Sequence, residues 1–98
     1  MFSIPRVNVV ESDAGFSVEV LGRTGILYCE SGRSMKIDSE VLMGSIAMAV
    51  YSYSFSSWLP PHQAEPVDDA TKARIAENLR AAFRFQGFEI DIISFDGN

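Results

Sequence analysis

The 98-residue chain has little of the chemistry on which small enzymes and metalloproteins depend. Its single cysteine, Cys29, excludes an internal disulfide and a cysteine-rich zinc site, and it fits a reducing compartment. His62 is the single histidine, and the nearby acids Glu65, Asp68 and Asp69 lack a recognised metal-ligand spacing. We therefore expect no metal site and no cofactor.

Motifs for nucleophilic or phosphate chemistry are missing as well. The sequence contains neither G-x-S-x-G nor a glycine-rich phosphate loop. Cys29 falls in the centre of a predicted strand, where a thiol is usually a small core residue, and Glu40 has no identifiable partner acid. We predict no catalytic residues and no enzyme, and a small enzyme that uses Cys29, His62 or Glu40 is the least favoured alternative.

Long apolar runs and an excess of basic residues are absent. No run approaches the roughly 20 apolar residues of a membrane helix, and the N-terminus lacks the pattern of a signal peptide. The formal net charge of −5 disfavours nucleic acid and suits a basic protein partner, although such a charge often serves solubility alone. We expect a soluble, cytoplasmic protein with no membrane partner, folded as one domain over residues 1–98.

What the sequence does contain is a series of short strands in its first half. Alternation of apolar and polar residues predicts strands over 6–10, 16–20, 26–30 and 34–38, with a tight hairpin turn at Gly32. Residues 38–44 form a more ambiguous connector with one possible helical turn. A longer fifth strand is predicted over 46–55, with Tyr51, Tyr53 and Phe55 on one face and at least one tyrosine in the core.

One helix is predicted in the second half, and a last strand follows it. Asp68 or Asp69 supplies the N-cap, residues Ile75, Leu79, Ala82 and Phe83 share one face, and Gly87 stands at the expected left-handed C-terminal position. The last strand begins at Phe88, with Phe88, Ile90 and Ile92 alternating against acids, and Ile93 and Phe95 make its second face partly apolar, as in a central strand. The order predicts an α+β fold: a mostly antiparallel curved sheet of about five to six strands, with one long helix packed on one face before the last strand.

Residues 56–66 hold the single tryptophan and three of the four prolines. The ring of Trp58 favours burial over a sheet edge, while Pro60 and Pro61 stiffen the chain. One interpretation is a rigid loop that Trp58 anchors to the fold. A second and compatible interpretation is that the exposed part, especially His62 and Gln63, meets a partner.

The segment 32–40, the tyrosine-rich strand, the Trp58–His62 segment and the helix around Ile75 together resemble the immunity protein 74 family over about residues 15–93. Members of this family are small cytoplasmic proteins of bacterial polymorphic-toxin systems. The resemblance implies that the chain binds and neutralises a cognate toxin, without catalysis. The family motif covers Glu40, Trp58, Pro60 and Pro61, and it assigns none of them to an interface.

An acidic domain without catalytic groups is consistent with inhibition of a basic toxin, because complementary fields speed association. Aromatic anchors beside acids are typical of interface hot spots. The partner-binding patch predicted on this basis consists of Tyr51, Tyr53, Trp58, His62, Asp68 and Asp69, each of which also suits a core or capping position. The chain is expected to be a monomer or a homodimer. The alternative function is an unrelated small cytoplasmic binding or assembly module of unknown ligand, one version of which is a homodimer that pairs exposed sheet edges.

Overall fold

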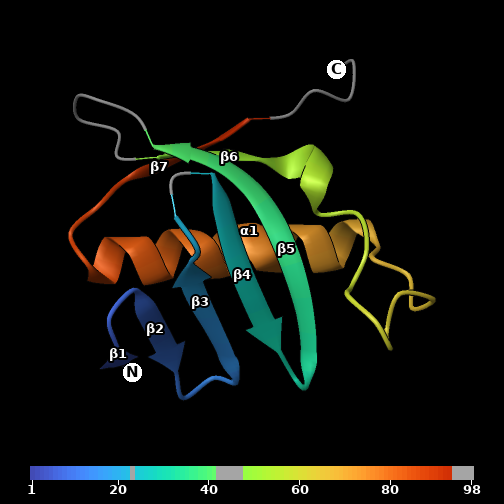
Figure 1. The fold of residues 1–98 in the computed structure, drawn as a ribbon, viewed down its shortest axis with the longest axis horizontal. Helices are drawn as coiled ribbons and strands as arrows, with labels where there is room; N and C mark the ends of the chain where they lie inside the picture. Colours follow the sequence, from blue (N-terminus) through green and yellow to red (C-terminus); the bar gives the residue numbers. More distant parts are fainter. Residues whose placement is uncertain (23, 42–47, 94–98) are drawn as a thin grey trace.

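The computed structural model describes residues 1–22, 24–41 and 48–93, and it confirms an α+β fold. One open sheet has its strands in sequence order, antiparallel up to β6, and a single long helix packs against it (Figure 1). The elements are β1 (Phe2–Arg6), β2 (Val9–Ser12), β3 (Phe16–Val20), β4 (Gly25–Glu30), β5 (Arg33–Val41), β6 (Met48–Tyr51), η1 (Ser52–Ser54), α1 (Asp69–Phe85) and β7 (Ile90–Ile93).

The first half of the chain contains one strand more than predicted. The expected strand over 6–10 is interrupted by a turn at Val7 and Asn8, and residues before and after this turn form the separate strands β1 and β2. Asn8 adopts a φ of 69°, a left-handed conformation that asparagine tolerates. The sheet therefore has seven strands rather than five to six.

The hairpin between β4 and β5 forms as predicted. Glu30 pairs with Arg33, and Ser31 and Gly32 occupy the two turn positions with φ values of 51° and 80°. Two successive positive φ values are typical of a type I′ turn, whose twist suits a two-residue hairpin. Strand β5 then continues to Val41, so the ambiguous connector is extended at least to that residue, and residues 42–44 lie outside the described residues.

The long strand predicted over 46–55 is wrong in its second half. Strand β6 ends at Tyr51, and Ser52–Ser54 form one turn of 3₁₀ helix; residues 46 and 47 lie outside the described residues. The hydroxyl of Ser54 donates to the carbonyl of Tyr51 at 2.6 Å and accepts from the Asp38 amide at 2.9 Å. Such local side-chain bonds compete with a strand ladder. Phe55 enters the core, whereas neither tyrosine does.

The helix begins and ends as its local signals predict. The side chain of Asp68 accepts a hydrogen bond from the Thr71 amide at 2.8 Å, which satisfies a free donor of the first turn. At the other end, Gly87 has a φ of 90°, and the amide of Phe88 donates to the Phe83 carbonyl at 2.9 Å. This pattern is a Schellman motif, which ends the helix and directs the chain into β7.

The two faces of the sheet have different surroundings. On the helix side, residues in register such as Val18, Tyr28 and Met35 are buried against one stripe of α1, formed by Ile75, Leu79, Ala82 and Phe83. On the opposite side, called here the outer face, the residues between them point away from the helix. None of the described helices packs across this face as α1 does on the other. Side chains such as Glu40 and Asp91 are exposed there, although Val9 and Ala49 are buried.

The last strand joins the sheet by a crossover. Strand β7 pairs with β6 in parallel, and the connection between them runs through η1, the proline-rich loop and α1. Parallel neighbours need such a connection, because a short turn can join only antiparallel strands. The predicted last strand is confirmed but covers Ile90–Ile93, and Phe95 lies outside the described residues.

Candidate partner-binding surface

Trp58 belongs to the hydrophobic core. Its side chain is 4% exposed and lies in the same buried cluster as Phe55 and the apolar stripe of α1. The next residue, Leu59, donates its amide to the Ser34 carbonyl at 2.7 Å, so the loop continues the hydrogen bonding of β5 where β6 has ended. The burial of Trp58 bears out the anchoring interpretation, and the ring belongs to the core rather than to the exposed surface.

His62 lies where the loop crosses the tip of the β4–β5 hairpin. Its Nδ1 is 2.6 Å from Oε2 of Glu65, and Nε of Arg33 donates to the other oxygen of that carboxylate at 2.6 Å. The hydrogen bonds from Arg33 and His62 lower the pKa of Glu65 below its ordinary value. His62 is thus half-buried in a contact that joins the loop to the hairpin.

Tyr51 and Tyr53 form a stacked pair on the outer face. Their ring centroids are 5.8 Å apart with an interplanar angle of 29°, and Tyr53 is 52% exposed. The hydroxyl of Tyr51 donates to Glu40 at 2.8 Å, and this bond raises the pKa of Tyr51 above its ordinary value. A hydrogen bond to Asp38 raises the pKa of Tyr53 in the same way. Each tyrosine is therefore tied to one acid of β5.

The two aspartates at the start of the helix have separate roles. Asp68 caps the helix, and its hydrogen bonds with Thr71 lower the pKa of its carboxyl. Asp69 lines a shallow cleft of about 290 Å³ between η1 and the first turns of α1, and Tyr53 and Lys72 line the same cleft. Of the six predicted residues, the structure thus groups Tyr51, Tyr53 and Asp69 and places Trp58 beneath the surface.

A polar network between the helix and β4 escaped the sequence reasoning. The guanidinium of Arg74 donates two hydrogen bonds to Glu30, at 3.0 and 2.6 Å, and Tyr28 donates to the same carboxylate at 2.6 Å. Asn78 donates to the Tyr28 hydroxyl at 2.8 Å. Arg74 and Glu30 are 44 residues apart in sequence, so no local pattern indicates the pair.

This network makes the stability of the fold sensitive to acid. Desolvation acts to raise the pKa of Glu30, but hydrogen bonds from Arg74 and Tyr28 outweigh it and hold the pKa below its ordinary value of 4.5. A carboxylate with a lowered folded-state pKa stabilises the fold above its ordinary pKa and loses this contribution as the pH falls through the lower value. We expect the free energy of unfolding to decrease as the pH falls from about 4.5.

The Arg74→Gln variant tests this prediction. It should lose about 1 kcal/mol of stability at pH 7, since charged hydrogen bonds to a mostly buried carboxylate are removed. Its stability should also depend less steeply on pH below 4.5. Urea denaturation between pH 3 and 7 measures both effects, and Arg80→Gln is the matched control because its partner Glu77 is 77% exposed. An equal pH dependence in wild type and Arg74→Gln would contradict the assignment.

The candidate catalytic residues Cys29, His62 and Glu40 each contact a different polar group in the described part of the chain. The nearest polar partner of the Cys29 thiol is the Ser34 hydroxyl at 3.4 Å, and a hydroxyl is a poor base for activating a thiol. The ring of His62 bonds the Glu65 carboxylate, and the exposed carboxylate of Glu40 accepts from Tyr51. Among the described residues, histidine, cysteine and acidic side chains form no group that could hold a metal ion.

A second surface is apolar. A groove of about 720 Å³ lies beside the C-terminal end of α1, and its exposed apolar side chains include Ile4, Val41, Phe85 and Phe88. Among the described residues its polar lining consists of Asn8 and Gln86, so the described lining carries no charge. The groove therefore differs chemically from the acidic and aromatic outer face.

Fold and surface together define a small α+β domain in which one crossover helix covers one face of an open sheet. A family model described as Immunity protein 74 matches residues 17–93, which is most of the chain. The chain therefore belongs to the immunity protein 74 family, and the resemblance noted in the sequence is confirmed. Membership implies a toxin partner in general terms, and proteins of this kind are generally non-catalytic.

The chain matches no curated protein and no solved structure. Within residues 1–22, 24–41 and 48–93, no helix has the length and apolar character needed to cross a bilayer.

Proposed function

We propose that this chain binds and neutralises a cognate toxin of a bacterial polymorphic-toxin system in the cytoplasm, by protein–protein contact without catalysis. The observation that carries this proposal is the family match over residues 17–93. The net charge of −5 supports a basic toxin domain as the partner, because opposite net charges speed the encounter of two proteins.

Within this function, the members of the predicted patch that lie outside the core are the proposed contact residues. Tyr51, Tyr53 and Asp69 lie around the η1 turn, and Asp68 and His62 lie further along the loop and helix. Trp58 supports them from the core. This arrangement fits the usual anatomy of an interface, in which aromatic anchors have polar neighbours.

Co-expression tests the function directly. A toxin domain encoded by the gene next to that of this chain should arrest growth when expressed alone, and this chain should restore growth and co-purify with it. An unrelated acidic protein of similar size, expressed at the same level, controls for a non-specific effect of charge. Failure of both growth rescue and co-purification would contradict the proposed toxin neutralisation.

A second candidate function is a homodimeric assembly module. The apolar groove beside α1 favours it, because exposed Phe85 and Phe88 stand near the free edge strand β1. Pro5 in that strand limits edge-to-edge pairing, since proline lacks an amide hydrogen for the ladder. Light scattering over a range of concentrations measures the oligomeric state. A molar mass that stays at the monomer value would exclude the homodimeric assembly module.

A further inference from the structure

Ion pairs are distributed unevenly between the two sides of the molecule. Around the helix, Glu30 pairs with Arg74, Glu77 with Arg80, and Glu89 with Arg84. The described carboxylates that form no ion pair are Glu11, Asp38, Glu40 and Asp91 on the outer face, with Asp68 and Asp69 at the start of the helix. The negative charge of the chain is thus least neutralised on the outer face.

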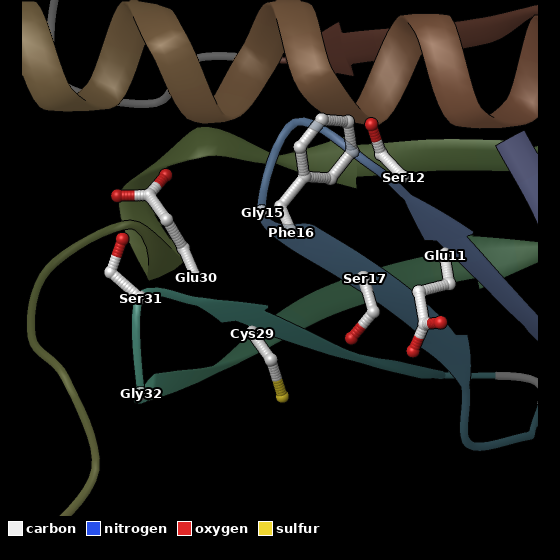
Figure 2. Close-up of a pocket in the computed structure, with 9 residues that line it drawn as sticks. All are labelled: Glu11, Ser12, Gly15, Phe16, Ser17, Cys29, Glu30, Ser31 and Gly32. Carbon is white, nitrogen blue, oxygen red and sulfur yellow. The ribbon is translucent and has the colours of Figure 1, made fainter. Parts of the chain in front are cut away.

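Figure 2 shows the two faces at one end of the sheet. Phe16 and Ser12 point towards the helix, whereas Glu11, Ser17 and Cys29 point to the opposite side. The cations that the register places on the outer face are Arg6 and Lys36, and Arg6 lies 3.8 Å from Glu19. Towards β6 and β7 the charged residues of this face are acids.

Strands β5 to β7 bring three of these acids around the tyrosine pair. Glu40 is in register with Ala49, and Ala49 with Asp91, so the two acids flank one small residue on the same face. Two strand spacings separate them, which is roughly 10 Å. Tyr51 follows two residues after Ala49 and bonds Glu40, and Tyr53 bonds Asp38. An aromatic pair, of which Tyr53 is exposed and Tyr51 half-buried, therefore stands between carboxylates.

This combination suits a guanidinium group. Arginine stacks on the faces of aromatic rings, and its planar fork donates two hydrogen bonds to one carboxylate. Each carboxylate accepts a hydrogen bond from its tyrosine, and an ionised carboxylate has about four lone-pair sites, so it can also accept from a second donor. The stacked rings and their hydroxyl bonds are in place in the free chain, which lowers the entropy lost on binding.

We infer that the outer face of β5–β7, with Tyr51 and Tyr53 as aromatic anchors, binds the toxin through arginine side chains of the toxin. This inference rests on the proposed function and adds the surface and the chemistry of the partner. Charge complementarity favours this face over the apolar groove, whose described lining carries no charge. Asp69 adjoins this surface, because it lines one cleft with Tyr53 and Lys72, whereas Asp68 is occupied as the helix cap.

Charge reversal on the two sides of the molecule tests the surface. The C-terminal domain of the toxin encoded next to this chain, with its active site inactivated, is titrated calorimetrically with the wild type and with three variants. Glu40→Lys should weaken binding by roughly 30-fold or more, because it places like charge against the toxin's arginines. Tyr53→Ala should weaken it by roughly 10-fold or more.

Glu77→Lys is the matched control, since it makes the same change in net charge on the exposed side of α1. It should alter affinity by less than about 3-fold, consistent with a screened charge distant from the interface. Equal losses of affinity for Glu40→Lys and Glu77→Lys, or no loss for Glu40→Lys, would contradict the assignment of this surface. Neither result would contradict toxin binding itself.

A second probe separates this inference from the proposed function. Hexa-arginine peptide is titrated into isotopically labelled full chain, and backbone amide shifts are followed by NMR. The largest shifts should fall on residues of the outer face such as Glu40, Ala49 and Tyr53, and Glu40→Lys should abolish them. Shifts centred on α1, or none, would overturn the inference. A toxin that fails to bind while the peptide shifts this face would overturn the proposed function and support the chemistry of the face.

Discussion

Trp58→Ala should destabilise the protein by about 3–5 kcal/mol, the usual cost of truncating a fully buried large aromatic residue. The ring is 4% exposed and packs in the same cluster as the buried stripe of α1. Its loss leaves a cavity at the point where the loop seals the free edge of β5. Urea denaturation followed by circular dichroism measures the change in the free energy of unfolding.

The neighbouring residue supplies a matched control for this prediction. Leu59 is 39% exposed and holds β5 through its backbone amide, so Leu59→Ala should cost less than about 1 kcal/mol. Similar losses in the two variants would show that the loop packs differently from the arrangement described. A small loss in both would mean that the loop does not hold the fold.

Leu79→Ala is the second substitution with a large expected effect. Leu79 is fully buried at the centre of the helix stripe, and truncation of such a residue costs about 2–5 kcal/mol. The cavity is one reason for the large effect. A second reason is that α1 lies in the connection from β6 to β7, so a poorly packed helix also weakens the pairing of these two strands. Thermal and urea denaturation should both show the loss.

Glu77→Ala on the solvent side of the same helix serves as the control. Its side chain is 77% exposed and makes one long ion pair with Arg80 at 3.5 Å, so the expected change is below about 0.5 kcal/mol. Both substitutions introduce alanine, which has a high helix propensity, so the two variants differ mainly in the burial of the side chain that is removed. Equal destabilisation by the two variants would contradict the assignment of the buried face.

Elements with strong local signals were predictable from sequence. The cap at Asp68, the apolar stripe of α1 and the glycine at position 87 specify the helix through contacts within a few residues. The turn at Gly32 and the burial of Trp58 follow from conformational freedom and ring size in the same way. The helix signals and the turn depend on neighbours in the sequence, whereas the burial of Trp58 was expected from the size of its apolar ring.

Features that depend on register or on hydroxyl bonding were not predictable. In the 3₁₀ turn after Tyr51 the Ser54 hydroxyl bonds the Tyr51 carbonyl and the Asp38 amide of β5, and the alternating pattern gives no sign of these bonds. Strand β1 escaped prediction because most of its residues are exposed and one of them is proline. The acids around the tyrosine pair become neighbours only when β5, β6 and β7 lie in register.

The sequential strand order has a consequence for how the chain folds. From β1 to β6, each strand pairs with the one that precedes it in sequence, so these contacts close short stretches of chain. The pairing of β6 with β7 instead spans the loop and the whole of α1. We expect the meander to assemble first and the β6–β7 closure to come late, so that substitutions in α1 and β7 speed unfolding more than they slow folding.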